Sequence, residues 1–146
     1  MATNRITIDT RPDGVFRVLS DPASYPRWVV GASEIRDVEG RWPEPGSRIH
    51  HSVGWGPLRL EDNTESLAMD KDRRLVLEAR ARPLGRARVE LILRPTDGGT
   101  EVTMIEQVVS PPLVALLNPV LDPLIHARNV ETLRRLRGLI RQVASR

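Results

Sequence analysis

The sequence contains no cysteine, and its only aromatic residues are three tryptophans, one tyrosine and one phenylalanine. The absence of cysteine excludes disulfide bonds, thiolate zinc sites and a thiol nucleophile. No apolar run approaches the roughly 20 residues that a membrane-spanning helix requires. Residues 1–10 also lack the apolar core of a signal peptide, so we expect a cytoplasmic protein without stable membrane insertion.

Lysine is nearly absent as well, because Lys71 is the sole lysine and arginine supplies the other basic side chains. The net charge is only +3, and the arginines are interleaved with Asp and Glu. A nucleic-acid-binding surface would gather basic residues beside exposed aromatic ones. We therefore expect no nucleic-acid partner.

Motifs of several enzyme classes are missing: there is no G-x-S-x-G elbow, no phosphate-binding P-loop and no dinucleotide fingerprint. The histidines are His50, His51 and His126. No pair of them has metal-ligand spacing on a helix, and His50 and His51 are adjacent on a predicted strand, so they point to opposite faces. The sequence predicts neither a metal site nor a cofactor.

The overall composition is that of a soluble globular protein, with 40% hydrophobic and 28% charged residues. A length of 146 residues suits one domain with a sizeable core, so we expect residues 1–146 to form a single domain.

The C-terminal segment has the clearest periodicity. Its apolar residues step by three and four, which places them on one face of a helix; these residues are Leu133, Leu136, Ile140 and Val143. Pro119 and Pro123 interrupt the segment before them, because proline removes a backbone donor and clashes one turn back. We predict one long helix over Asp122–Ala144 with a kinked or broken approach.

The middle of the chain alternates between apolar and polar residues and is divided by short turns. This pattern predicts an antiparallel sheet with one buried face, which the C-terminal helix is the only element long enough to cover. Two short helices, one beginning near Pro12 and one through Tyr25–Trp28, follow the first strand. The predicted strands are Arg5–Asp9, Ser33–Glu39, Arg48–Val53, Leu58–Leu67, Arg74–Arg82, Arg86–Arg94 and Thr100–Val109.

The inner face of the predicted long helix changes character along its length. Asp122, His126 and Asn129 share the side of Leu133, although a helix on a packed core should be apolar throughout. One interpretation is that the prolines break the phase and these groups reach solvent. The other is that the three residues face a cavity between the helix and the sheet.

Several local motifs, in this order, resemble the START-like, helix-grip (SRPBCC) superfamily, and in particular its bacterial polyketide cyclase/dehydrase-like branch. The motifs are Asp21-Pro22 through Trp28, Trp42 through Ser47, Gly54-Trp55-Gly56-Pro57, Gly98 through Thr103, and Arg128-Asn129 with Leu133 and Leu136. The resemblance implies an α+β fold, with a curved antiparallel sheet of about seven strands gripping the long helix and a hydrophobic cavity between them. It also implies a lipid-, sterol- or polyketide-like ligand, but it transfers no catalytic residue to any position of this chain.

Glu106 is the most informative carboxylate, because Val102, Met104 and Val108 alternate with it on one predicted strand face. A buried carboxylate must be paired or have a raised pKa. Arg128 or Asn129 would be its partner in a structural tie, whereas a ligand-orienting or acid/base role would leave it open to the ligand. Simple exposure to solvent is the third alternative.

The remaining candidate site residues follow from the same assignment of faces. His51 lines the cavity if its strand neighbours point inward, and His126 could pair with Asp122 one turn away; either histidine, like Glu106, could then act as an acid or base. The other predicted ligand-binding residues are Asp62, Thr64, Leu77, Val89, Leu91, Met104 and Leu133.

Three functions fit these patterns. The first is a carrier, sensor or chaperone that binds a small hydrophobic or amphipathic molecule. The second is an enzyme that cyclises or dehydrates a polyketide-like substrate. The third is a protein-interaction module that uses an arginine-rich outer sheet face, formed by Arg80, Arg82, Arg86 and Arg88.

Overall fold

The computed structural model describes residues 1–55, 58–81, 85–109 and 118–145; within these ranges the side chains at 53–55, 58–60, 81 and 118–122 are not described. The helices are α1 (Pro12–Leu19), the 3-10 turn η1 (Pro22–Ser24), α2 (Tyr25–Trp28) and α4 (Asn118–Ala144). The strands are β1 (Ala2–Ile8), β2 (Ala32–Glu39), β3 (Arg48–Trp55), β4 (Leu58–Asp70), β5 (Arg74–Ala81), β6 (Gly85–Thr96) and β7 (Gly99–Val108).

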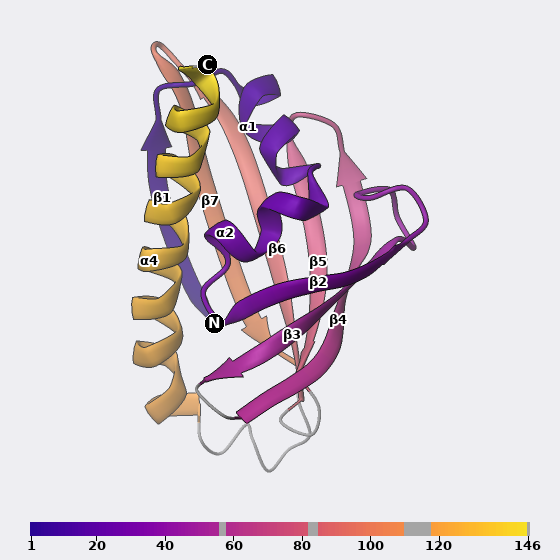
Figure 1. Ribbon diagram of the computed structural model, residues 1–146. Helices are drawn as coiled ribbons and strands as arrows, with labels where there is room; N and C mark the ends of the chain where they lie inside the picture. The colour runs from indigo at the N-terminus through magenta and orange to yellow at the C-terminus, as the bar shows by residue number, and fades with distance from the viewer. Residues whose placement is uncertain (56–57, 82–84, 110–117, 146) are drawn as a thin grey trace.

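The seven strands form one antiparallel sheet in the order β1-β7-β6-β5-β4-β3-β2. Figure 1 shows the sheet curving from β1 round to β2. The α+β, helix-grip fold predicted from the sequence is therefore confirmed. The predicted strand Arg74–Arg82 agrees as far as Ala81, whereas Arg82 lies outside the described residues.

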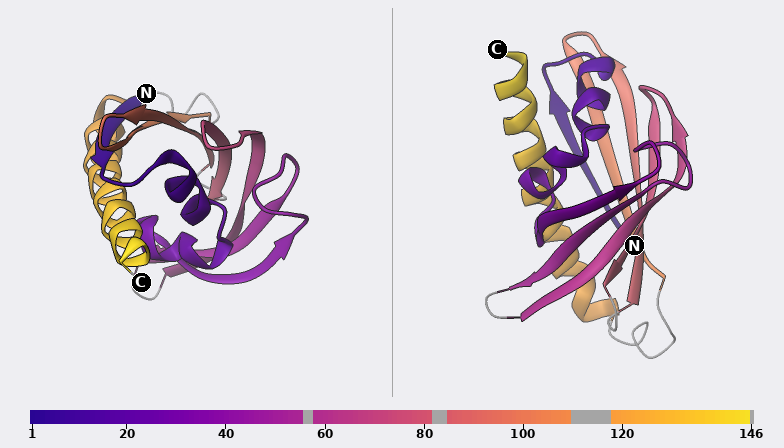
Figure 2. Two further views of the ribbon diagram at one scale, coloured as in Figure 1. Left: turned by 90° about the horizontal axis from the view of Figure 1, so that it is seen from above. Right: turned by 45° about the vertical axis from the view of Figure 1, so that its right-hand side comes forward.

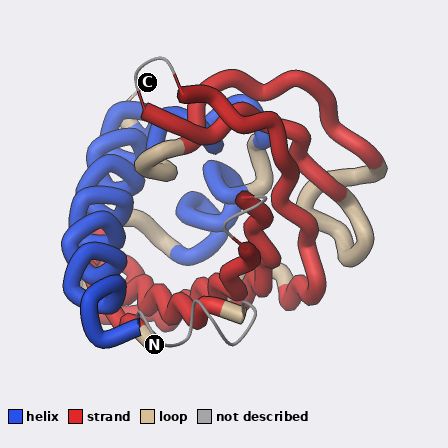
Figure 3. The backbone as a smooth tube through the Cα atoms, turned by 90° about the horizontal axis from the view of Figure 1, so that it is seen from below, coloured by secondary structure: helices blue, strands red, loops and turns tan. Residues whose placement is uncertain are grey.

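Helix α4 closes the open side of the curved sheet. Its main packing partners are the edge strand β1 and the short helix α2, with further contacts to α1. Figure 2 shows the strands curving around the short helices while α4 runs along the gap, and the view from below in Figure 3 shows the same enclosure. The core side chains therefore lie between the concave face of the sheet, the short helices and α4.

The apolar stripe of α4 is buried as expected at Leu133, Leu136 and Ile140. The prediction is wrong at Val143, which is 38% exposed, while Leu139 at 6% joins the core instead. The helix also begins earlier than predicted, at Asn118. Pro119 then falls in the first turn, where its missing amide hydrogen would have no helical partner in any case.

The concave side of the sheet carries the core. Alternate residues of β5, β6 and β7 point inward and pack with α1, α2 and α4. The sheet register sets Glu106 opposite Val89 on β6 and Ala2 on β1, so this carboxylate faces the same interior. The fully buried large apolar side chains are Ile8, Val15, Ile49, Leu75, Leu91, Val102, Leu133, Leu136 and Ile140.

Candidate functional site

The interior between sheet and helix holds an ion pair. The Glu106 side chain on β7 is 3% exposed, and Nη2 of Arg128 on α4 donates to its two carboxylate oxygens at 2.5 and 2.7 Å. The Arg128 side chain is 40% exposed, so the pair lies where the interior meets solvent. Nε of Arg128 is nevertheless buried and has no hydrogen-bond partner among the described residues.

Asn129, the next residue of α4, is fully buried. Its Oδ1 accepts a long hydrogen bond of 3.4 Å from Nη2 of Arg128. Its Nδ2 has no hydrogen-bond partner in the described part of the chain. Because nearly all buried polar groups are satisfied by protein, water or ligand, this amide requires an acceptor that the described side chains do not supply.

A hydrogen-bond chain crosses the other side of the interior. The Tyr25 hydroxyl from α2 lies 3.0 Å from Oγ1 of Thr64 on β4, and the same oxygen lies 2.8 Å from Nε2 of His51 on β3. If Tyr25 donates to Thr64 and Thr64 donates to His51, every hydroxyl hydrogen has an acceptor. In that arrangement Nδ1 of His51 carries the ring hydrogen, and this buried atom has no hydrogen-bond partner among the described residues.

Burial controls the pKa values of His51 and Tyr25, the two titratable residues of this hydrogen-bond chain. Desolvation lowers the pKa of His51 below its ordinary value, against smaller opposing effects from the Ser52 backbone and the Asp62 carboxylate. Burial raises the pKa of the Tyr25 hydroxyl. The histidine is therefore a neutral imidazole and the tyrosine a neutral phenol at pH 7.

Tyr25 joins the two halves of the interior. The charges of Arg128 and Glu106 both act on its hydroxyl, and its ring centroid lies 5.4 Å from that of His51. We call these six residues the buried polar cluster: Tyr25, His51, Thr64, Glu106, Arg128 and Asn129. They come from α2, β3, β4, β7 and α4, so only the folded chain brings them together.

The cluster presents hydrogen-bond donors that lack acceptors. Nε of Arg128 and Nδ2 of Asn129 are donors, and Nδ1 of His51 is a third in the arrangement described above. The one carboxylate, Glu106, is already neutralised by Arg128. The groups that would satisfy these donors are oxygen acceptors.

A sequence profile of the family described as polyketide cyclase / dehydrase and lipid transport matches residues 2–141. The chain belongs to this family. The resemblance inferred from the sequence motifs is thereby confirmed. No functionally curated protein matches the sequence.

Solved structures share the fold over nearly the whole chain. Protein NE0264 from Nitrosomonas europaea matches with a TM-score of 0.76 at 19% identity, covering 99% of this chain and 96% of that one. Ara h 8.0201 gives 0.72 at 13% identity and covers 96% of each chain. The di-domain ARO/CYC protein StfQ from the steffimycin biosynthetic pathway gives 0.76 at 12% identity, over 99% of this chain and 51% of StfQ. At such low sequence identities, the structural similarity establishes a common fold and nothing further.

The structure places most of the predicted site residues on the concave side. Glu106 and Asn129 meet at Arg128, and His51 meets Thr64, with Asp62 opposite His51 in the register of β3 and β4. The apolar candidates lie buried around them: Leu77, Val89, Leu91, Met104 and Leu133.

His126 does not join the cluster. It is exposed, and its Nδ1 accepts a hydrogen bond of 3.1 Å from Nδ2 of Asn4 on β1. It thus lies at the seam between α4 and the sheet edge. Asp122 lies within α4, but its side chain is outside the described part of the structure, so its pairing with His126 stays a prediction.

Tyr25 is the cluster residue that sequence reasoning did not assign to the site. The available signal was chemical, because a buried tyrosine hydroxyl generally needs a hydrogen-bond partner, and Tyr25 is the sole tyrosine. Arg128 had been considered only as a partner for Glu106, which is the contact that the structure shows.

The described residues contain no group of three or more His, Cys, Asp or Glu that could hold a metal ion. In the described ranges, no helix has both the length and the apolar character needed to cross a membrane.

Proposed function

We propose that the protein binds an oxygen-bearing, otherwise apolar small molecule, such as an aromatic polyketide, in the interior between the sheet and α4. The observation that carries the proposal is the presence of adjacent buried donors without acceptors, Nε of Arg128 and Nδ2 of Asn129. A buried unsatisfied group costs about 1–3 kcal/mol, so a carbonyl or hydroxyl oxygen placed between them would bind favourably.

The surroundings of these donors suit an apolar skeleton. Leu91 and Leu133 are nearly inaccessible to solvent, and Met104 is 4% exposed. Burial of apolar ligand surface against such side chains contributes about 25 cal/mol per Å². The family description, which names both polyketide chemistry and lipid transport, supports a ligand of this kind.

A pair of ring systems that differ only in oxygen content tests the proposal. We expect 1,8-dihydroxyanthraquinone to quench tryptophan fluorescence saturably, because Trp28 lies 5.5 Å from Tyr25, ring centroid to ring centroid. The substitution Asn129→Leu removes one donor while keeping a side chain of similar size. It should weaken binding of the quinone roughly tenfold and leave the binding of anthracene unchanged or tighter.

Arg135→Gln is the matched control, since Arg135 is exposed on the same helix and pairs with Glu131. This variant should bind both compounds like the wild type. Saturable quinone binding that is unaffected by Asn129→Leu would remove Asn129 from the site. Absence of saturable binding by either compound to the wild-type protein would overturn the proposal.

A second candidate is a cyclase or dehydratase, and the chain from Tyr25 through Thr64 to His51 favours it. A neutral imidazole held by a hydroxyl can accept or return a proton, and the nearby Glu106 carboxylate adds a second ionisable group. StfQ, a similar fold, is described as an ARO/CYC protein. If the protein is such an enzyme, a poly-β-ketone incubated with it should be cyclised by wild type and by His50→Gln, but not by His51→Gln.

A further inference from the structure

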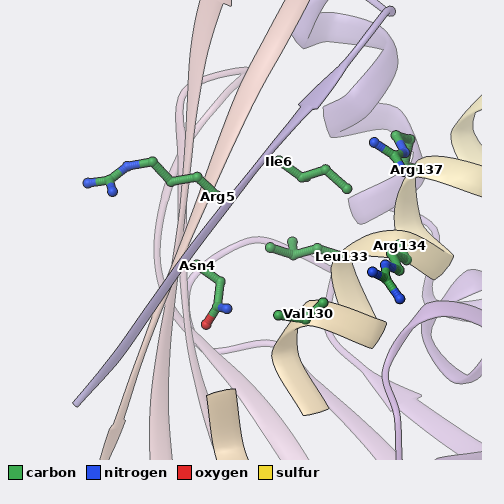
Figure 4. Close-up of a pocket in the computed structure, with 7 residues that line it drawn as sticks. All are labelled: Asn4, Arg5, Ile6, Val130, Leu133, Arg134 and Arg137. Carbon is green, nitrogen blue, oxygen red and sulfur yellow. The ribbon is translucent and has the colours of Figure 1, made fainter. Parts of the chain in front are cut away.

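A surface groove lies between β1 and α4, apart from the buried polar cluster. It has a volume of about 280 Å³, near the lower end of the roughly 300–1,000 Å³ of small-molecule pockets. Figure 4 shows its walls, one from the edge strand and one from the helix. The lining residues are Asn4, Arg5, Ile6, Val130, Leu133, Arg134 and Arg137.

The groove has an apolar floor. Ile6 of β1 faces Val130 and Leu133 of α4 across it (Figure 4). Leu133 is only 2% exposed and also belongs to the core, so it separates the groove from the interior of the protein. This floor suits a short aliphatic chain, since each buried methylene contributes about 0.8 kcal/mol.

Two cationic side chains border the floor. Arg134 and Arg137 lie one turn apart on α4 (Figure 4), and neither forms a hydrogen bond or a close ion pair with a described residue. The charge of Arg137 also acts at longer range on the carboxylate of Asp9. Their helix neighbours differ, because Arg135 pairs with Glu131 and Arg141 pairs with Asp9. Arg5 also lines the groove, but its guanidinium points away from α4 in Figure 4, so we give it no role.

We propose that the groove between β1 and α4 binds a short-chain aliphatic carboxylic acid. The carboxylate is held by Arg134 and Arg137, and the chain lies on Ile6, Val130 and Leu133. Charge-assisted hydrogen bonds to guanidinium groups are roughly twice as strong as neutral ones, so the carboxylate is the main determinant of affinity. This site does not depend on ligand binding in the interior.

Titration of the 15N-labelled protein with two compounds of equal chain length tests the groove. Octanoate should bind more tightly than 1-octanol, with amide shifts concentrated in residues 4–6 and 130–137. The double substitution Arg134→Gln/Arg137→Gln should weaken octanoate binding roughly tenfold or more. Arg135→Gln, the neighbouring control, should leave it unchanged.

His51→Gln should not alter binding in the groove, so the two sites are tested separately. Equal binding of octanol and octanoate, or unchanged octanoate binding in the double variant, would overturn the proposal. Binding only to phosphatidylglycerol vesicles, with no binding of free octanoate, would also overturn it and indicate a membrane-facing surface.

Discussion

At the scale of single residues, the clearest steric requirement is at Gly99, the first residue of β7. A Cβ atom placed there would lie 2.0 Å from the carbonyl oxygen of Ile8 on the neighbouring strand. Because that oxygen belongs to the backbone, Gly99→Ala cannot be relieved by a side-chain rotation. We expect it to lower the free energy of unfolding by about 1–3 kcal/mol, measured by urea denaturation.

The adjacent Gly98 is the matched control, since a Cβ atom there would meet no atom within 4 Å. Gly98→Ala should change the free energy of unfolding by less than about 0.5 kcal/mol. Equal losses in the two variants would contradict the close approach of β7 to Ile8.

His51 predicts a pH dependence of stability. Its pKa is lowered in the folded protein by burial, from an ordinary value of 6.5. As the pH falls through about 6.5, the unfolded chain binds a proton that the folded protein does not, so the free energy of unfolding decreases. The decrease continues until the pH reaches the lowered pKa of the folded state.

The measurement is the free energy of unfolding of wild type and of the His51→Gln variant between pH 8 and 4.5. The advantage of wild type over His51→Gln should shrink on acidification, because only the unfolded chain gains the proton over this range. A wild-type advantage over His51→Gln that is independent of pH would show that His51 is not buried as a neutral imidazole.

Single-residue chemistry was only partly predictable from the sequence. The burial of Glu106 followed from its place in an alternating strand, and Arg128 was one of its two expected partners. The exposure of His126 was harder to predict. Helical periodicity gives the side of α4 on which His126 lies, but not the point along the helix beyond which the sheet edge no longer covers that side. Tyr25 was missed because its contact with Thr64 joins residues 39 apart in the sequence, which no local pattern reports.

At the scale of elements, α4 stabilises the fold through its buried stripe. Leu136 is fully buried, so Leu136→Ala should cost about 2–5 kcal/mol in the free energy of unfolding. Val143→Ala, on the last turn of the same helix, should cost less than about 1 kcal/mol because that side chain is 38% exposed. A small loss for Leu136→Ala in chemical denaturation would contradict the packing of α4 described here.

The elements themselves were well predicted, and the reason is physical. Antiparallel strands can be predicted from short stretches of sequence, because they show period-two alternation and are joined by short turns. Every predicted strand has a counterpart in the sheet. Errors were confined to element ends. One such addition, at β4, extends the predicted Leu58–Leu67 to Asp70, because three further residues pair with β5 across a register shift.

At the scale of the whole molecule, the outer face of the sheet is balanced in charge. Glu78 is buried between Arg80 and Arg86, and Arg48 pairs with Glu65. Further pairs join Arg74 to Glu90 and Arg94 to Glu101. This pairing satisfies much of the arginine-rich surface internally, so the outer face gives less support to an acidic protein partner than the interior gives to a small ligand.

The enclosure formed by sheet, short helices and α4 could be predicted from the order of elements, but the arrangement of the buried polar cluster could not. The cluster brings together six side chains from five elements. Their relative positions depend on the curvature of the sheet and on where α4 lies along the sheet. Neither quantity is encoded in a local pattern. Only the three-dimensional structure shows that the buried donors of Arg128 and Asn129 lack acceptors among the described residues.

The most direct test of the central proposal is to locate a bound ligand by intermolecular nuclear Overhauser effects. With 1,8-dihydroxyanthraquinone added to 13C,15N-labelled protein, we predict contacts from its ring protons to the side chains of Tyr25, His51 and Asn129. Contacts to Ile6 and Val130, with none to Tyr25, His51 or Asn129, would place the ligand in the surface groove and contradict binding at the buried polar cluster.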